Sequence, residues 1–263
     1  MKGVYTIFTH LAFGFVVGLC FGSFANVLIY RLPRKLPIVS SRSACTACKS
    51  TIPFYDLIPV VSWVLLRGRC RHCKEQISIR YPLIEILCAL VFVGMILATG
   101  DLSLIFLCLL AFVLLVVSFI DADTQEIPDG PLIFAALVGI GFVVAGQFSC
   151  LFYHSPSIIG AGLGILVGGL PLLIIDRITL ILFKKDGFGY GDVKLMAVCG
   201  MFLGWQLTLV AFFIAFITGG MYATFLLVSR RVRRGEYIAF GPFLCAGVIA
   251  AIWFGQELTS FIL

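Results

Sequence analysis

The stretch Phe188-Gly-Tyr-Gly-Asp-Val-Lys194 separates two long apolar runs of the chain with glycine and polar residues. It carries one aspartate, Asp192, at the start of the apolar run that follows. An ionisable side chain at the edge of a membrane span is costly to keep, which makes it a functional candidate. Gly189 and Gly191 let backbone or substrate approach where a side chain would block access. Because one aspartate alone supports little chemistry, a partner has to come from elsewhere in the chain.

The composition is that of a membrane protein. The 263 residues are 61% hydrophobic and 12% charged, whereas a soluble domain is about 25% charged. Mean hydropathy is +1.11. The net charge of +6 does not indicate a nucleic-acid partner, because the basic residues are unevenly placed along the chain. We therefore predict an all-α polytopic membrane protein whose partner is the lipid bilayer.

Eight apolar runs approach the roughly 20 residues that are needed to cross a bilayer. They are residues 7–29, 82–99, 102–120, 131–149, 158–183, 192–204, 207–229 and 241–262. Tight turns at Gly100 and Gly204 connect neighbouring runs. Three glycines that recur every four residues predict a face for close helix packing; they are Gly160, Gly164 and Gly168.

The basic residues predict the orientation of these spans. With the N-terminus outside the cytoplasm, the connections at 30–81, 121–130, 184–191 and 230–240 fall on one side. That side holds 17 of the 19 Lys and Arg residues when Lys194 is included, and the two exceptions are Lys2 and Arg177. By the positive-inside rule it is the cytoplasmic side. Arg177 lies near the inner end of its span and can extend its head group to the interface.

Residues 30–81 form the one sizeable extramembrane segment, between a first membrane helix (1–29) and a membrane domain (82–263). Two Cys-x2-Cys pairs lie within it, Cys45 with Cys48 and Cys70 with Cys73. This spacing predicts a structural zinc site with four thiolate ligands. Two disulfides or a redox pair would use the same residues, but the cytoplasm is reducing. We expect His72 to be a bystander, and the six other cysteines to have no functional role.

An acidic cluster follows the third predicted span, in the stretch Phe119-Ile-Asp-Ala-Asp-Thr-Gln-Glu-Ile-Pro-Asp129. Asp121 and Asp192 both fall at the predicted cytoplasmic interface. Two aspartates at a partly dry interface can share one proton, so that one activates water while the other polarises a peptide carbonyl. The remaining acids, Asp123, Glu126 and Asp129, are more typical of caps and solvated loops. A cation or proton path in a transporter would use the same residues as the aspartate pair.

These motifs together resemble the type IV prepilin peptidases, which are membrane aspartyl proteases with a G-x-G-D motif. The matching residues are Gly189-Tyr-Gly-Asp192 with Lys194, Asp121 before Ile127-Pro128-Asp129, Gly22-Ser-Phe-Ala-Asn26, Tyr30-Arg-Leu-Pro33, both cysteine pairs and Ser78-Ile-Arg-Tyr-Pro82. The resemblance covers about residues 18–86 and 117–200. Their order and spacing along the chain make a chance match improbable.

The resemblance implies two activities at a bacterial inner membrane. One is cleavage of the basic leader of prepilins and pseudopilins after a glycine, on the cytoplasmic side, with Asp121 and Asp192 as the catalytic aspartates. The other is methylation of the new N-terminus with S-adenosylmethionine. Gly189, Gly191 and Lys194 would support the catalytic loop. Weaker candidates for binding substrate or methyl donor are Asn26, Arg31, Glu85, Asp123 and Glu126, and Glu85 fits equally well as the structural partner of an arginine.

Two other classes of protein would use the same residues. A cation- or proton-coupled transporter would use the acids, although transporters place such acids near the bilayer midplane rather than at span ends. A thiol–quinone oxidoreductase would use the cysteine pairs, but on the oxidising side of the membrane. Cleavage of a prepilin-like peptide separates the peptidase from both. The sequence makes no prediction of the oligomeric state.

Overall fold

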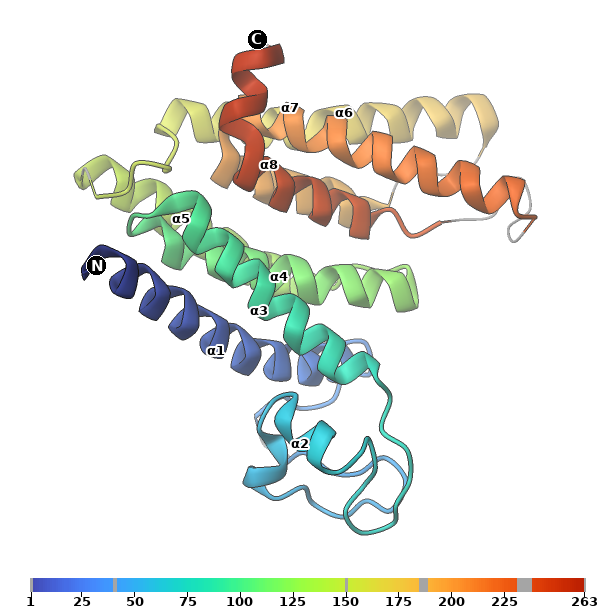
Figure 1. Ribbon diagram of the computed structural model, residues 1–263. Helices are drawn as coiled ribbons and strands as arrows, with labels where there is room; N and C mark the ends of the chain where they lie inside the picture. Colours follow the sequence, from blue (N-terminus) through green and yellow to red (C-terminus); the bar gives the residue numbers. More distant parts are fainter. Residues whose placement is uncertain (1, 40–41, 150, 185–188, 231–237, 263) are drawn as a thin grey trace. The chain divides into compact units, whose positions relative to one another are not determined.

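In the computed structural model the chain is built from helices (Figure 1). The structure describes residues 2–39, 42–149, 151–184, 189–230 and 238–262. The helices are α1 (Lys2–Arg31), the 3-10 helix η1 (Phe54–Leu57), α2 (Val61–Leu65), α3 (Arg80–Thr99), α4 (Ser103–Thr124), α5 (Asp129–Phe148), α6 (Ile158–Phe183), α7 (Tyr190–Val228) and α8 (Gly241–Ile262). The all-α prediction is confirmed, and the described residues hold no β-strand beyond two isolated bridges.

The chain forms two compact units, Met1–Leu97 and Ala98–Leu263. In the first unit, α1 and α3 touch backbone to backbone. A Cβ atom added to Gly18 would lie 2.5 Å from the Cα atom of Ala89, and one added to Gly22 would lie 2.5 Å from that of Glu85. Small residues permit such an approach between membrane helices. The cysteine segment, which connects the two helices, belongs to the same unit.

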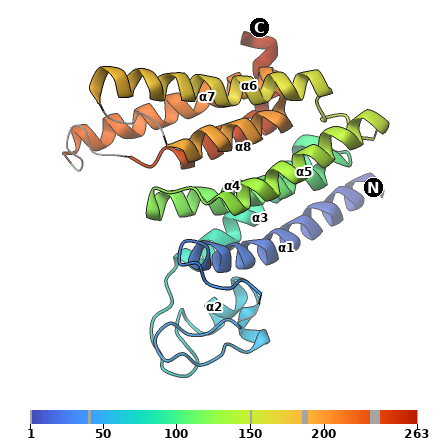
Figure 2. The ribbon, with the colours of Figure 1, turned by 180° about the vertical axis from the view of Figure 1, so that it is seen from behind.

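The second unit contains α4 to α8, and Figures 1 and 2 both show α6, α7 and α8 side by side. The predicted glycine face joins α6 to α7. A Cβ atom on Gly164 would lie 2.0 Å from the carbonyl oxygen of Gly200, and one on Gly168 would lie 2.1 Å from that of Met196. The packing prediction is confirmed for these two glycines.

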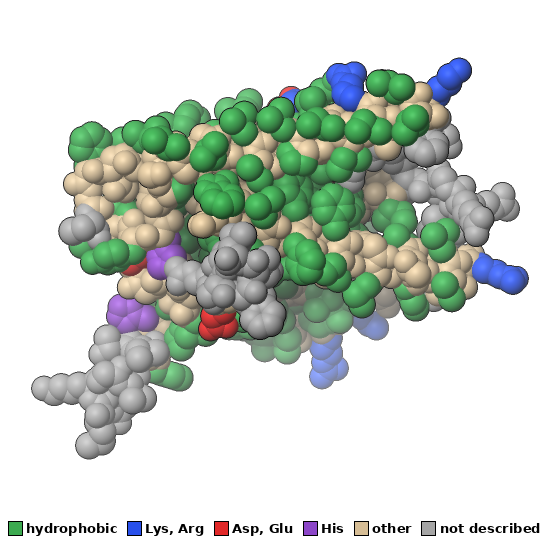
Figure 3. Space-filling model, turned by 90° about the horizontal axis from the view of Figure 1, so that it is seen from above, with side chains coloured by type: hydrophobic (Ala, Val, Ile, Leu, Met, Phe, Trp, Pro, Cys, Tyr) green, Lys and Arg blue, Asp and Glu red, His purple; other side chains and the backbone are tan. Residues whose placement is uncertain are grey.

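Among the residues that the structure describes, six helices are long and apolar enough to cross a membrane, and they include α7 with its 39 residues. The predicted spans 192–204 and 207–229 both fall on α7, which ends at Val228, one residue before the end predicted for the second. The predicted span 241–262 coincides with α8, whose apolar part Gly241–Gly255 is shorter than the other candidates. In Figure 3 the side chains over α6 and α7 are largely hydrophobic, and the few Lys and Arg side chains lie from the middle of the molecule toward one end, as expected of helices that face lipid.

The chain reverses its direction inside α7, at Gly204. This glycine has φ 71° and ψ 175°, which are not helical values. Gly219, in the second half of α7, packs against the ring of Phe240. Asp192, in the first half, interacts electrostatically with Asp121, which in turn accepts a hydrogen bond from the amide of Gly241. A straight helix would hold residues 192 and 219 about 40 Å apart, so α7 is two helices joined by the tight turn that the sequence predicts.

Some residues used in the predictions lie outside the described part of the chain. They are Phe188 of the glycine-rich stretch, Cys150, and four of the basic residues behind the orientation, Lys185, Arg231, Arg233 and Arg234.

Candidate functional site

Asp192 lies in the first turn of α7, and Gly189 is the N-cap residue of that helix. The backbone amide of Asp192 donates to the carbonyl of Gly189 at 3.0 Å. Its side chain is buried, and its Oδ1 atom has no hydrogen-bond partner among the described residues. A buried carboxyl oxygen without a partner is uncommon and calls for a functional explanation.

Asp121 lies in the last turn of α4 and is 5% exposed. Its Oδ2 atom accepts a hydrogen bond of 2.9 Å from the backbone amide of Gly241, at the start of α8. Asp123, two residues later, is exposed because neighbouring positions of a helix point to different faces. The helix therefore turns one acid of this cluster inward and leaves the other in contact with solvent.

Close contacts between loops and helix ends bring the two buried acids together. A Cβ atom on Gly191 would lie 2.7 Å from Cβ of Ile127, so the start of α7 packs directly on the loop that follows α4. The charge of Asp121 acts on Asp192, which places the two carboxyl groups within electrostatic range of each other. A pair of buried carboxyl groups cannot readily carry two negative charges, and sharing one proton is the stable arrangement.

Lys194 and Tyr190, which flank the buried acid, make contacts outside the pair. Lys194 Nζ donates to Asp129 Oδ1 at 2.8 Å, and both side chains are exposed. Arg177 of α6 donates to the hydroxyl of Tyr190. The first contact links the start of α7 to the start of α5, and the second links it to α6, so the glycine-rich segment is held from two sides.

The four paired cysteines lie in two turns of similar geometry. In the first, the amide of Lys49 donates to the carbonyl of Cys45, and Lys49 has a positive φ of 59°. In the second, the amide of Lys74 donates to the carbonyl of Cys70, and Lys74 has a φ of 61°. An isolated bridge closes each turn, Ala44 with Thr51 and Arg69 with Gln76. Each Cys-x2-Cys pair is thus presented by one knuckle.

The thiols of this cluster could hold one metal ion. The sulfur atoms of Cys45, Cys48, Cys70 and Cys73 lie within 4.8 Å of one another, and those of Cys45 and Cys73 are 3.8 Å apart. Zinc–sulfur bonds of about 2.3 Å in a tetrahedron place the sulfur atoms about 3.8 Å apart. A hydrogen bond with the hydroxyl of Ser50 helps lower the pKa of Cys48 to about 6, whereas desolvation and the neighbouring thiols raise the pKa of Cys73 to about 11.

Three of the weaker candidates belong to the first unit, where each has a structural contact. Asn26 donates to the carbonyls of Gly22 and Tyr81, and Arg31 donates to three backbone carbonyls of the loop that follows α1. Glu85 accepts a hydrogen bond of 2.7 Å from the backbone amide of Val60. The partners of Glu85 include this backbone amide and the side chain of Ser23, whereas the structural alternative considered from the sequence was an arginine.

Two features of the second unit were not found from the sequence. The amide of Gly241 is the partner of Asp121, and a glycine followed by Pro242 is a recognisable helix start that could have been noted. Asp176, which precedes the Arg177 singled out from the sequence, is buried in α6. An acid within an apolar run was the available signal for Asp176.

Two sequence families cover most of the chain. Residues 16–99 match the Bacterial Peptidase A24 N-terminal domain, and residues 108–224 match the Type IV leader peptidase family. With its multi-pass helical fold, the chain is a membrane enzyme of a protease family.

Curated relatives resemble the chain over nearly its whole length. A prepilin leader peptidase/N-methyltransferase of Aeromonas hydrophila is 36% identical and covers 95% of this chain and 92% of its own. Proteins of the same name from Pseudomonas putida and Neisseria gonorrhoeae are 33% and 34% identical, over 92% and 87% of this chain and 90% and 85% of their own. The chain belongs to the type IV leader peptidase family. No solved structure matches it.

Proposed function

We propose that the chain is an aspartic endopeptidase that removes the basic leader of prepilins and pseudopilins after a glycine, and then methylates the new N-terminal residue. Asp121 and Asp192 are the catalytic pair. The observation that carries this assignment is that two acids from different helices are buried together, in a chain whose relatives are named prepilin leader peptidase/N-methyltransferase. The comparisons give no support to the alternative of a transporter.

The chemistry needs one proton shared between the two carboxyl groups. The ionised carboxylate takes a proton from a water molecule, whose oxygen attacks the carbonyl carbon of the scissile peptide bond. The protonated carboxyl donates its proton to the carbonyl oxygen, which gives a neutral tetrahedral intermediate. When the carbon–nitrogen bond breaks, the nitrogen takes the proton of the protonated carboxyl and leaves as the amine of the mature protein, while one hydroxyl of the intermediate gives its proton to the other carboxylate and becomes part of the new carboxyl group of the leader. The pair returns to its starting state of one proton and one charge.

Gly189, Gly191 and Lys194 shape the segment that presents Asp192. A Cβ atom on Gly189 would lie 3.6 Å from Asp192 Oδ2, so a glycine keeps the side of this carboxyl open to a substrate backbone. Gly191 permits the contact with Ile127, and Lys194 holds the helix start to Asp129. None of the three needs to touch the reacting atoms. Their role is to position Asp192.

The four thiolates of the cysteine cluster would bind one structural zinc ion. Zinc supplies folding free energy to a segment that is too short for a large apolar core. The ligands would be Cys45, Cys48, Cys70 and Cys73, and His72 is not needed to complete a tetrahedral set. Zinc takes no part in peptide cleavage under this proposal.

The proposed location is the bacterial inner membrane, with the acid pair at the cytoplasmic face. The basic loops support this orientation by the positive-inside rule. A prepilin would place its apolar helix in the bilayer and its leader at the interface, where the exposed acids Asp123 and Glu126 attract basic residues.

In the second reaction the methyl group of S-adenosylmethionine passes to the new amine, which loses a proton while the sulfonium becomes a thioether.

One experiment tests both activities. The purified protein is incubated in lipid with a prepilin-like peptide and S-adenosylmethionine, and the products are identified by mass. The proposal predicts a leader peptide that ends in glycine and a mature peptide that carries one methyl group. An uncleaved peptide, with the enzyme shown to be folded and inserted, would contradict the peptidase assignment. A cleaved peptide without the methyl group would contradict the second activity alone.

A further inference from the structure

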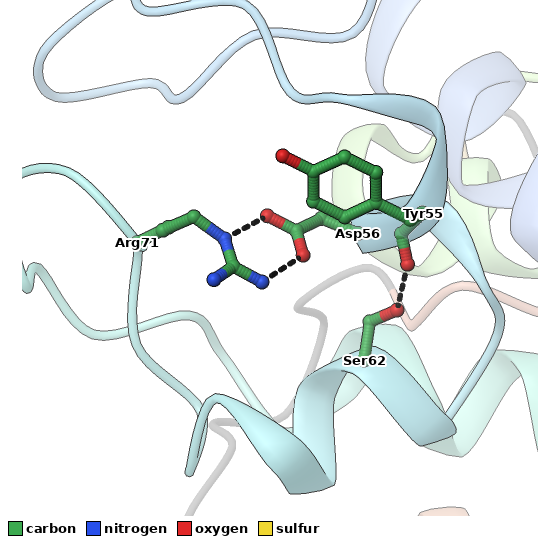
Figure 4. Close-up of polar contacts among 4 residues, drawn as sticks. All are labelled: Tyr55, Asp56, Ser62 and Arg71. Atoms are coloured by element: carbon green, nitrogen blue, oxygen red, sulfur yellow. Dashed lines mark hydrogen bonds and ion pairs between the residues drawn. The ribbon is translucent and has the colours of Figure 1, made fainter.

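The burial pattern of the short helix α2 is the reverse of that in a soluble domain, because its polar residue is buried and three of its apolar residues are exposed. Its polar residue Ser62 is buried, and its hydroxyl donates to the carbonyl of Tyr55 at 3.0 Å (Figure 4). Its apolar residues Val61, Val64 and Leu65 are exposed. Positions three and four apart lie on the same side of a helix, so these three side chains form one outward apolar surface.

The neighbouring 3-10 helix extends this surface. We call the combined set the apolar face, and it consists of Phe54, Leu57, Ile58, Val61, Val64 and Leu65. Phe54 is 79% exposed and Leu65 is 77% exposed, and the other four are also exposed. A contiguous patch of large apolar side chains on an extramembrane segment marks a site of contact with a membrane or another protein.

Hydrogen bonding places the start of α2 beside a membrane span. Val60, the N-cap residue of α2, donates its amide to Glu85 of α3 at 2.7 Å. Glu85 lies five residues after Arg80, the first residue of α3, which is about 7.5 Å along the helix. The start of α2 is therefore level with the second turn of a membrane-spanning helix. Figures 1 and 2 both show α2 close to the end of α1, the other span of this unit.

The same segment of the chain is strongly basic. Between Arg31 and Arg80 there are ten Lys and Arg but only two acids, Asp56 and Glu75. Arg67 and Arg69, which follow α2 directly, are exposed. An anionic lipid surface attracts basic residues near the membrane by about 1 kcal/mol each. An apolar surface flanked by exposed basic side chains is the pattern of elements that lie in the membrane interface.

A fixed contact joins the apolar face to the cysteine cluster. Arg71, in the second knuckle, donates two hydrogen bonds to the carboxylate of Asp56 in η1, at 2.6 and 2.8 Å (Figure 4). The hydrogen bond from Arg71 holds the pKa of Asp56 below its usual range, so the pair is charged at neutral pH. The side chain of Asp56 is only 6% exposed, and both of its oxygens are paired with the guanidinium of Arg71, which is the bidentate geometry of a strong and specific contact.

We propose that the apolar face is a membrane-docking element, which inserts into the surface of an anionic bilayer and holds the four-cysteine domain against it. Both chain connections of the domain enter membrane helices, so the bilayer surface lies next to it. The lipid acyl chains cover the apolar side chains, and the anionic head groups meet the basic residues around them. The ion pair of Arg71 and Asp56 fixes the knuckles relative to the apolar face, so the orientation of the face on the bilayer also sets that of the knuckles.

The test measures the depth of single residues in a bilayer. A fluorescent amino acid is placed at Leu65, at Phe54 or, as a control, at Ala47 of the first knuckle, in the full chain in lipid nanodiscs. Lipids brominated along the acyl chain quench from the membrane, and iodide quenches from the water. The metal content of each variant shows whether the domain is folded. The measurement is repeated with and without phosphatidylglycerol.

The proposal predicts that the probes at Leu65 and Phe54 lie about 5–10 Å within the interface, quenched by bromine and shielded from iodide. The probe at Ala47 should show the reverse. Removing phosphatidylglycerol should move the first two probes toward the water. Quenching of Leu65 by iodide as strong as that of Ala47 would overturn the proposal, and shielding from both quenchers would do the same because protein would then cover the face. An unchanged depth without phosphatidylglycerol would overturn the requirement for anionic lipid.

Discussion

The cysteine cluster and the buried acid pair are both polar sites in an apolar chain, but they are built in different ways. The four thiols come from two short knuckles of one segment, and each knuckle is shaped by its own turn. The two acids come from α4 and α7, and their meeting depends on α5, α8 and the reversal at Gly204. One site is local and depends on its ligands, whereas the other depends on the packing of a whole unit.

This difference separates the changes that should damage each site. Loss of one thiol should disorder the segment around the knuckles and leave the helices of the second unit packed. A methyl group added at a close helix contact should disturb the acids and leave the metal bound.

The largest effect is expected from removing one ligand of the cluster. Cys45→Ser should abolish stoichiometric zinc binding and unfold the knuckles, because metal binding to such sites supplies about 10–16 kcal/mol. Metal analysis and limited proteolysis of the purified protein measure this. Cys20→Ser, which changes an exposed cysteine of α1, should retain the metal. One zinc ion still bound to the Cys45 variant would contradict the four-thiolate site.

The next largest effect is expected on the rate of leader cleavage when Gly241, the hydrogen-bond partner of Asp121, is changed. A Cβ atom on Gly241 would lie 2.6 Å from Asp121 Oδ2, so Gly241→Ala should displace this carboxyl and slow cleavage by about 100-fold, the cost of a 1 Å misplacement. Initial rates of leader cleavage by the variant and the parent chain measure this decrease. The matched control is Gly220→Ala, since no atom lies within 4 Å of its added Cβ. Equal rates for the two variants would show that this contact is not needed.

A smaller effect is expected where α6 meets α7. Gly164→Ala would bring a Cβ atom within 2.0 Å of the carbonyl oxygen of Gly200. Overpacking of this kind costs about 1–3 kcal/mol, so the unfolding temperature in detergent should fall. Gly162→Ala is the control in the same helix, because its added Cβ meets no atom within 4 Å. The prediction fails if both variants unfold at the temperature of the parent chain.

The smallest effect is expected at the exposed ion pair of Lys194 and Asp129. Side-chain exposures of 52% and 63% limit the free energy of such a pair to about 0–1 kcal/mol. A double-mutant cycle with Lys194→Ala and Asp129→Ala measures the coupling, which should decrease further at high salt. A coupling of several kcal/mol would show that Lys194 does more than hold the helix start.

The sequence predicted those features that depend on short patterns. The all-helical fold, the cysteine cluster, the turn at Gly204 and the glycine contacts of α6 each follow from a few neighbouring residues. A Cys-x2-Cys pair specifies its own turn, and a glycine at helical spacing specifies a close contact. These features therefore require no knowledge of distant parts of the chain.

The contacts made between distant segments could not be obtained in this way. The hydrogen bond from Gly241 to Asp121 joins residues 120 positions apart, and no local pattern encodes it. For Glu85 the sequence left open a binding role or a structural pairing with an arginine, and the loop before α2 brings the amide of Val60 to it. The outward apolar face of α2 was also missed, because an apolar run in sequence does not indicate which side becomes buried.

The central claim is that Asp121 and Asp192, rather than the neighbouring acids, carry out cleavage. The most direct measurement is the rate of prepilin cleavage by Asp121→Asn and Asp192→Asn, each shown to be inserted and to retain its metal, beside Asp123→Asn as a control on the exposed side of α4. Loss of an acid–base group should lower the rate by about 10²–10⁴-fold or more. The Asp123 variant loses one exposed charge that attracts the leader, which contributes about 0–1 kcal/mol, so its rate should fall by no more than about fivefold. Cleavage at the parent rate by either of the first two variants would contradict the assignment.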